Sequence, residues 1–187
     1  MRGKRRTTAP TSSVKISIVL PLFDCRTAGW RSLESALAQS HPRDAYEVIA
    51  VTGRTREGAA HDATLDALLA RCDVVVRTDL DADDVTNETA LYAAGHAQAS
   101  GDLLLFMEGH TALEPDCCRV IDRHFRRHAS SALAWAPRRN HGTTPLGRLV
   151  SLHNLRHERR ASAHGTFSLG ANTVIRAPFG GVVSARP

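Results

Sequence analysis

The sequence predicts an α/β fold, in which helices cover both faces of a mainly parallel β-sheet to form a three-layer sandwich. Short apolar segments typical of strands alternate four times with segments whose apolar residues recur at helical spacing. This alternation favours parallel strands joined by right-handed crossovers. Segments such as IVL, VVV and LLLF are apolar throughout, as expected of strands in a sheet that is covered on both sides.

The size and composition of the chain favour one folded domain. With 187 residues, 42% of them hydrophobic, the chain can bury a single core. Residues 1–13 are rich in Arg, Thr and Ser without periodicity, and we interpret them as a disordered basic leader. Residues 14–187 are expected to form the domain.

Each predicted element is identified by the spacing of its apolar residues. Runs or alternations of apolar residues predict strands at 14–21, 47–51, 73–76, 103–107 and, more weakly, 132–135. Helical spacing predicts helices from near Thr27 to before Pro42 (Trp30, Leu33, Leu37), at 61–71 (Leu65, Leu68, Leu69), at about 87–99, and around Cys117, Ile121 and Phe125. An acidic loop is expected after residue 76.

Composition excludes several classes of protein. The net charge of +5 is a mild excess, and only 5% of the residues are aromatic, so the sequence does not predict a nucleic-acid-binding protein. The four cysteines form no C-x-x-C pair, which favours a reducing, cytoplasmic setting. No apolar run approaches the roughly 20 residues of a membrane-spanning helix. Peripheral membrane contact is left open.

The ends of the predicted strands are where a ligand is expected. In open parallel sheets, ligands bind beyond the carboxyl ends of the strands. Here those ends read PLFD (21–24), TGR (52–54) and EGH (108–110). Neither G-x-G-x-x-G nor G-x-x-x-x-G-K-[ST] is present, which argues against a dinucleotide-dependent redox enzyme and a P-loop NTPase.

Three stretches together resemble the family 2 glycosyltransferases of GT-A fold. VKISIVLPLFDCRTAGWRSLESALAQSHPRDAYEVIAV is similar to their opening, with Ser35, Gln39 and Pro42 close to an S-x-x-x-Q-x-x-P pattern. LYAAGHAQASGDLLLFMEGHTALEPDC resembles the stretch that contains their D-x-D motif and ends in P-D; its matching residues are Gly95, Ala99, Gly101, Pro115 and Asp116. FSLGANTVIR resembles a later G-x-N-x-x-x-R segment. The resemblance covers about residues 14–180 and implies a GT-A-like, Rossmann-type sandwich.

By this resemblance, Glu108-Gly109-His110 occupies the place of the family's D-x-D. In that motif one or both side chains hold a divalent cation, Mn²⁺ or Mg²⁺, that bridges the diphosphate of a nucleotide sugar. Such a cation acts as a Lewis acid on the departing diphosphate. Imidazole in place of a carboxylate shifts preference from Mg²⁺ toward Mn²⁺ or Zn²⁺. Two groups one residue apart on a strand point the same way, so Glu108 and His110 converge if the strand continues through Gly109.

The resemblance also implies a set of donor-binding residues: Pro21, Phe23, Asp24, Thr52, Arg54 and Gly109. Family members often place an acidic residue after the second strand to contact the nucleotide base, but this chain has Thr52-Gly53-Arg54 there. Thr52 is a candidate to hydrogen-bond the base and Arg54 to reach a phosphate. Asp24 either hydrogen-bonds the nucleotide or caps the helix expected near Thr27.

The function implied is transfer of a sugar from a nucleotide-diphosphate donor to a hydroxyl of an unidentified glycan, lipid or small-molecule acceptor, with inversion. The family's catalytic base lies beyond the last matched segment, so the domain is interpreted as incomplete at its C-terminus and no base is named. The alternative is a non-catalytic glycosyltransferase-like module that binds a nucleotide or a partner. A nucleotidyltransferase is disfavoured, because the loop after the first strand is poor in Gly, Arg and Lys.

Other polar clusters are interpreted as structural. Asp81-Ala82-Asp83 is literally a D-x-D tripeptide, but an acidic cluster before a helix is favoured by the helix dipole. The pairs His124/His128 and His153/His157, each at i, i+4 spacing, and the basic residues Arg156, Arg159 and Arg160 are more typical of solvated helix surface than of a ligand site.

Overall fold

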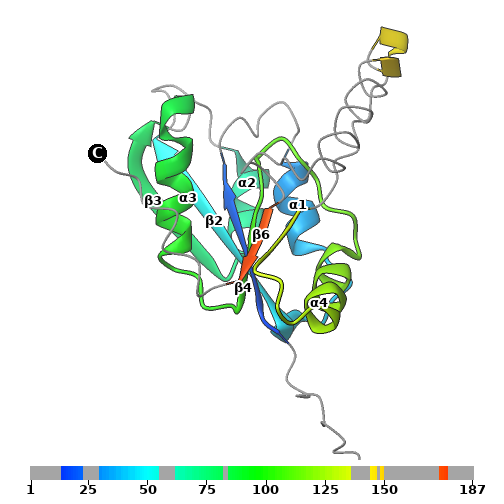
Figure 1. The fold of residues 1–187 in the computed structure, drawn as a ribbon. Helices are drawn as coiled ribbons and strands as arrows, with labels where there is room; N and C mark the ends of the chain where they lie inside the picture. Colours follow the sequence, from blue (N-terminus) through cyan, green and yellow to red (C-terminus); the bar gives the residue numbers. More distant parts are fainter. Residues whose placement is uncertain are drawn as a thin grey trace, which may run out of the picture.

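The fold is a six-stranded sheet with helices on both faces (Figure 1). The computed structural model describes residues 14–22, 30–54, 62–81, 84–135, 144–146, 148–149 and 173–176. The strands are β1 (Ile16–Pro21), β2 (Tyr46–Arg54), β3 (Val74–Asp81), β4 (Leu103–Phe106), β5 (Leu133–Trp135) and β6 (Thr173–Arg176). The helices are α1 (Arg31–Leu37), α2 (Ala63–Leu69), α3 (Glu88–His96) and α4 (Cys117–Arg127), with 3₁₀ turns η2 (Arg43–Ala45) and η3 (Val85–Asn87).

The sheet has the order β3-β2-β1-β4-β6-β5 and is mainly parallel, as predicted. Strands β1 to β4 pair in parallel, with β1 between β2 and β4. β6 pairs antiparallel with β4 and with β5, and so lies between two strands that precede it in the chain. The sequence patterns predicted β5 but not β6.

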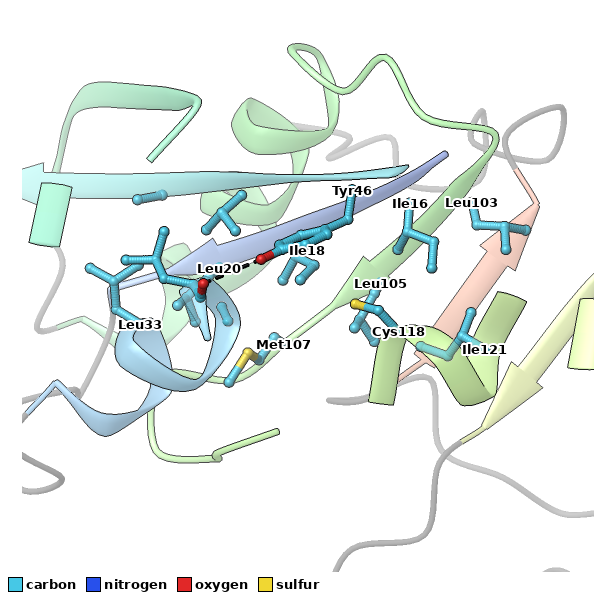
Figure 2. Close-up of a cluster of buried hydrophobic side chains, with 14 of the residues drawn as sticks. Ile16, Ile18, Leu20, Leu33, Tyr46, Leu103, Leu105, Met107, Cys118 and Ile121 are labelled. Atoms are coloured by element: carbon cyan, nitrogen blue, oxygen red, sulfur yellow. Dashed lines mark hydrogen bonds between the residues drawn. The ribbon is translucent and has the colours of Figure 1, made fainter. Parts of the chain in front are cut away.

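Side chains of the central strand alternate between two apolar layers. Ile16, Ile18 and Leu20 of β1 face a core that also contains buried residues of α1, α2 and α4. Figure 2 shows part of this cluster between the sheet and helices α1 and α4. Val19 faces the opposite side, where Leu91 of α3 packs. The predicted three-layer arrangement is therefore confirmed, with three helices on one face and α3 on the other.

Helix α3 lies unusually close to the sheet at Gly95. A Cβ atom at this position would be 2.5 Å from Val19 Cγ1 and 2.7 Å from Val51 Cγ2. Ordinary side chains do not approach so closely, so a residue without a side chain is required here. The close approach explains why a glycine stands inside a helix, where it costs about 1 kcal/mol relative to alanine.

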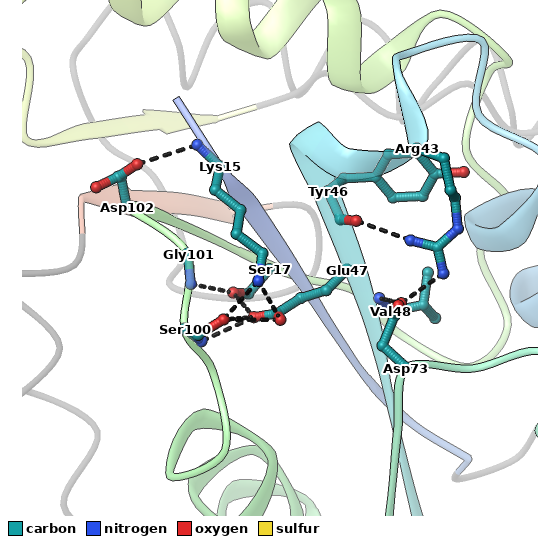
Figure 3. A network of polar contacts seen from close by, with 10 residues as sticks. All are labelled: Lys15, Ser17, Arg43, Tyr46, Glu47, Val48, Asp73, Ser100, Gly101 and Asp102. Atoms are coloured by element: carbon teal, nitrogen blue, oxygen red, sulfur yellow. Dashed lines mark hydrogen bonds and ion pairs between the residues drawn. The ribbon is translucent and has the colours of Figure 1, made fainter. Parts of the chain in front are cut away.

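A polar network joins the amino ends of β1, β2 and β4, at the edge of the sheet opposite the predicted ligand site (Figure 3). The Glu47 carboxylate accepts hydrogen bonds from Lys15 Nζ (2.7 Å), Ser17 Oγ (2.5 Å) and the Ser100 amide (2.7 Å). The Gly101 amide donates to Ser17 Oγ at 2.8 Å. Glu47 is only 7% exposed, so these bonds replace the water that the carboxylate loses on folding.

Some boundaries differ from those predicted. Helix α1 begins at Arg31 and not near Thr27, because Trp30 has a left-handed backbone (φ 60°) that precedes the first helical turn. β3 continues to Asp81 through the expected acidic loop, since residues 77–81 alternate between exposed and half-buried positions alongside β2. The leader, residues 1–13, lies outside the described residues. Among the residues that are described, no helix is long and apolar enough to span a membrane.

Candidate metal and donor site

The parallel strands bring three of the segments predicted from the sequence together at the carboxyl ends of the strands. Pro21, the last residue of β1, is aligned with Val51 of β2. On the other side of β1, Val19 is aligned with Phe106, and the Met107 amide donates to the Val19 carbonyl at 3.0 Å. Thr52, where β2 continues past the end of β1, and Glu108, which follows β4, therefore lie on either side of the carboxyl end of β1.

Glu108 and His110 converge through a turn and not along a strand. β4 ends at Phe106, and the Thr111 amide and hydroxyl donate to the Glu108 carbonyl at 3.1 and 2.9 Å. The expectation that the strand continues through Gly109 is therefore wrong. The i to i+3 turn instead reverses the chain, and the buried Gly109 occupies its centre.

The two side chains nevertheless face one another. His110 Nε2 lies 3.0 Å from Glu108 Oε2. The Glu108 side chain is 17% exposed and that of His110 is 52% exposed, so the pair stands where the protein interior meets solvent. A carboxylate oxygen and an imidazole nitrogen at this spacing form an ion-paired hydrogen bond when the imidazole is protonated. Atoms of the same two types can coordinate a cation when the imidazole is neutral.

The spacing of the pair fits a divalent cation. Adjacent ligands at about 2.1 Å from an octahedral ion are separated by about 3 Å, whereas on a tetrahedral ion they are separated by about 3.4 Å. The observed 3.0 Å is the length of a direct N–H···O bond between the two groups and is also close to the separation of adjacent ligands on an octahedral ion. A nitrogen ligand favours Mn²⁺ over Mg²⁺.

A cation at this position would need further ligands from outside the described residues. Within the part of the chain that the structure describes, no group of three or more His, Cys, Asp or Glu side chains could hold a metal. Two protein ligands bind a hard cation weakly unless phosphate oxygens and water complete its shell. The site is therefore suited to an ion that arrives with, or is retained by, a phosphate-bearing ligand.

The loop that follows the pair is hydrogen-bonded to helix α1. Gln39 Nε2 donates to the Glu114 carbonyl at 3.1 Å, and the Cys118 amide donates to Gln39 Oε1 at 3.0 Å. The Leu113 amide donates to Ser35 Oγ at 2.9 Å. Sequence reasoning noted Ser35 and Gln39 only as part of a family resemblance. The signal in the sequence that could have identified them is that Ser35 and Gln39 are polar residues spaced i, i+4 in a mainly apolar segment.

Helix α3 holds the other side of the same segment. The Tyr92 hydroxyl donates to the Met107 carbonyl at 3.1 Å, and its ring packs edge-on against Phe106 with centroids 5.5 Å apart. The residue before Glu108 is thus held by β1 through its amide and by α3 through its carbonyl. The pair is attached to both helical layers of the fold.

The remaining predicted donor residues lie near the same edge or outside the described residues. Thr52 Oγ1 donates to the Val76 carbonyl at 3.4 Å, a long contact that holds the hydroxyl weakly. Arg54 is exposed at the end of β2, and its Nε donates to the Asp79 carbonyl at 2.7 Å. Phe23 and Asp24 lie outside the described residues, so their predicted roles stay predictions.

The alternative polar clusters are placed away from the pair. Asp81 is the exposed last residue of β3, the outermost strand of the sheet, and it is aligned with Arg54; Ala82 and Asp83 are not described. The rings of His124 and His128 on α4 are tilted together with centroids 4.8 Å apart and are exposed. Residues 153–160 lie outside the described part of the chain.

Comparison with known proteins identifies the fold. No protein-family model and no curated protein matches the chain. Among solved structures, S. aureus TarS 1–349 in complex with UDP matches at 15% identity and a TM-score of 0.57, over 87% of this chain and 47% of that one. The same protein in complex with UDP-GlcNAc matches at 14% identity and a TM-score of 0.56, over 87% of this chain and 45% of that one.

A second enzyme gives a similar result. M. tuberculosis glucosyl-3-phosphoglycerate synthase matches at 18% identity and a TM-score of 0.52, over 88% of this chain and 58% of that one. The chain therefore has the GT-A-type fold of these glycosyltransferases. It spans about half the length of the TarS 1–349 chains that it matches.

Proposed function

We propose that residues 14–187 form a family 2-like glycosyltransferase domain that moves a sugar from a nucleotide-diphosphate donor to an acceptor hydroxyl. A divalent cation held by Glu108 and His110 assists the transfer. The observation that carries this proposal is the convergence of the two side chains, 3.0 Å apart, at the carboxyl end of β4. The likeness to TarS, solved with UDP and UDP-GlcNAc, supports a nucleotide-sugar donor.

Each residue at the edge has a distinct task under this proposal. The cation, when bound, offsets the negative charge that develops on the departing diphosphate. Glu108 contributes one negative charge and His110 a neutral nitrogen, so together they neutralise less of the cation's charge than two carboxylates would. Arg54 adds a second positive charge toward the phosphates, and Thr52 offers a hydrogen bond to the base.

The stereochemical course is proposed from the family resemblance. Inversion requires a base that removes the proton of the acceptor hydroxyl while that oxygen attacks the anomeric carbon from the side opposite the nucleotide. We do not assign the base to a residue. The acceptor is proposed only as a hydroxyl-bearing glycan, lipid or small molecule.

Calorimetry with UDP, in MnCl₂ or in EDTA, tests the binding site. Glu108→Gln and His110→Gln should each lower the Mn²⁺-dependent affinity at least tenfold, since losing even an outer partner of a metal ligand costs about 10- to 100-fold. Asp81→Asn is the matched control, because it neutralises a carboxylate at the same sheet edge on the outermost strand, and its affinity should stay within about twofold of wild type. Equal affinities in wild type and both site variants would remove the metal site from the proposal.

Turnover separates an enzyme from a binding module. Wild-type protein is incubated with UDP- and GDP-sugars, with and without Mn²⁺, and the released nucleotide is measured. A glycosyltransferase releases nucleotide slowly to water and faster with an acceptor. Tight nucleotide binding without release in either condition would favour the non-catalytic alternative.

A further inference from the structure

The loop between β4 and α4 is attached to the region of helix α1 by two polar side chains: Ser35, within the helix, and Gln39, two residues beyond its end. Gln39 is 8% exposed and uses its whole amide group. Its Nε2 donates to the carbonyls of Ser35 (2.8 Å) and Glu114 (3.1 Å), while its Oε1 accepts from the Cys118 amide (3.0 Å). A carboxylate could not donate these bonds, and an apolar side chain of similar size could not make any of them.

Ser35 and the end of α1 extend this attachment along the loop. The Ser35 hydroxyl donates to the Ser32 carbonyl at 2.8 Å and accepts from the Leu113 amide at 2.9 Å. The Ser40 amide donates to the Pro115 carbonyl at 2.7 Å. Helix α1 thus holds the loop backbone at Leu113, and the residues just after the helix hold it at Glu114 and Pro115. Buried polar groups satisfied in this way specify position more than they add stability.

The loop residues that these bonds fix begin just after the candidate metal ligands, Glu108 and His110. Thr111 closes the turn on the Glu108 carbonyl, and only one residue separates it from Leu113. Glu108 is held from the sheet side through Met107, but His110 is half exposed and lies on the far side of the turn. The path of the chain after the turn therefore decides where the imidazole stands relative to the carboxylate.

We propose that Gln39 is a positioning residue that, with Ser35, fixes the loop after β4 so that His110 stays within coordinating distance of Glu108. The inference rests on the proposed function for its consequence, metal-assisted donor binding. The part of the inference that does not depend on the proposed function is that Gln39 and Ser35 keep His110 close to Glu108. Loss of Gln39 displaces the Gly109–Thr111 turn and weakens cation retention, although Gln39 touches neither ligand.

The test combines amide NMR with paramagnetic line broadening by MnCl₂ in the presence of UDP. Gln39→Met keeps the side-chain volume but removes all the amide bonds. We expect it to shift the amide signals of Gly109 and His110, to speed exchange of the Cys118 amide at least tenfold, and to weaken Mn²⁺-induced broadening at His110 at least tenfold. Ser35→Ala, which removes the bonds to the Ser32 carbonyl and the Leu113 amide but keeps those of Gln39, should change the same signals less.

Tyr46→Phe is the matched control. It removes a buried hydrogen bond from the Tyr46 hydroxyl to the Leu37 carbonyl (3.2 Å) at the end of the same helix, and the contact of that hydroxyl with the Gln39 backbone. The side-chain amide of Gln39 and its bonds to the loop stay in place. Tyr46→Phe should leave the amide signals of Gly109 and His110 and the Mn²⁺-induced broadening unchanged. A larger change in Gln39→Met than in Tyr46→Phe would then not be due to general destabilisation.

The outcomes separate this inference from the function on which it rests. Unchanged Gly109 and His110 signals in Gln39→Met and Ser35→Ala would overturn the positioning role, whatever the protein binds. If wild type shows no broadening with MnCl₂ and UDP, the metal site fails, and the amide shifts alone then decide the positioning role. Should Gln39→Met not fold, Ser35→Ala provides the decisive comparison.

Discussion

The network around Glu47 provides a quantitative test of how the amino edge of the sheet is held. Burial alone would raise the pKa of the Glu47 carboxyl, but hydrogen bonds from Lys15, Ser17 and Ser100 outweigh burial and lower the pKa from its ordinary 4.5 to about 2. One pKa unit corresponds to about 1.4 kcal/mol of differential stabilisation. The ionised carboxylate therefore adds about 3 kcal/mol to the free energy of unfolding.

The pH range follows from the direction of the shift. Because the pKa of Glu47 is lower in the folded protein, its contribution is complete above about pH 4.5 and is lost as the pH falls toward 2. About 2 of the 3 kcal/mol should already be lost at pH 3. Only well below pH 2, where the carboxyl is protonated in both states, do the folded and unfolded chains bind nearly the same number of protons at this group.

Urea unfolding of wild type and Glu47→Gln between pH 7 and pH 3 measures this contribution. The variant should be less stable by about 3 kcal/mol at pH 7, and the difference should shrink to about 1 kcal/mol at pH 3. Asp102→Asn is the control, because Asp102 accepts the Lys15 amide in an exposed position (3.0 Å) and its loss should cost less than about 1 kcal/mol. A difference between wild type and Glu47→Gln that stays constant over this range would refute the reasoning.

Three further substitutions or reactions test the packing. Gly95→Ala should lower the free energy of unfolding by about 1–3 kcal/mol, because its Cβ would meet Val19 Cγ1 at 2.5 Å; a more stable variant would contradict this. Phe125→Ala, at a side chain only 2% exposed, should cost about 3–5 kcal/mol in urea unfolding, whereas a cost below 1 kcal/mol would mean that α4 is not packed as described. Burial raises the pKa of the Cys118 thiol to about 12, so at pH 8 iodoacetamide should label it at least about tenfold more slowly in native protein than in urea, as followed by peptide mapping.

The local pattern of residues determined most of the fold. Continuous apolar segments such as Ile18–Leu20 are expected to be buried on both sides, and they became the central parallel strands. The spacing of Leu33 and Leu37 identified the buried face of α1, and Cys117, Ile121 and Phe125 identified α4, although Cys118 is the more deeply buried cysteine. The carboxyl-edge rule for parallel sheets also predicted where Glu108 and Thr52 would gather.

Only the tertiary structure decided which distant residues meet. Strand β6 is four residues long, and its place between β4 and β5 depends on partners far away in the chain. The local sequence pattern therefore does not predict it. The bond between Gln39 and the Cys118 amide joins positions 79 residues apart, and the network at Glu47 includes a bond between Ser17 and Gly101, 84 residues apart. The spacing of hydrophobic residues predicts which side of a helix or strand is buried, because that side is set by many neighbouring residues of the same element. A hydrogen bond instead requires two specific atoms within about 3 Å, and the folded chain alone brings them there.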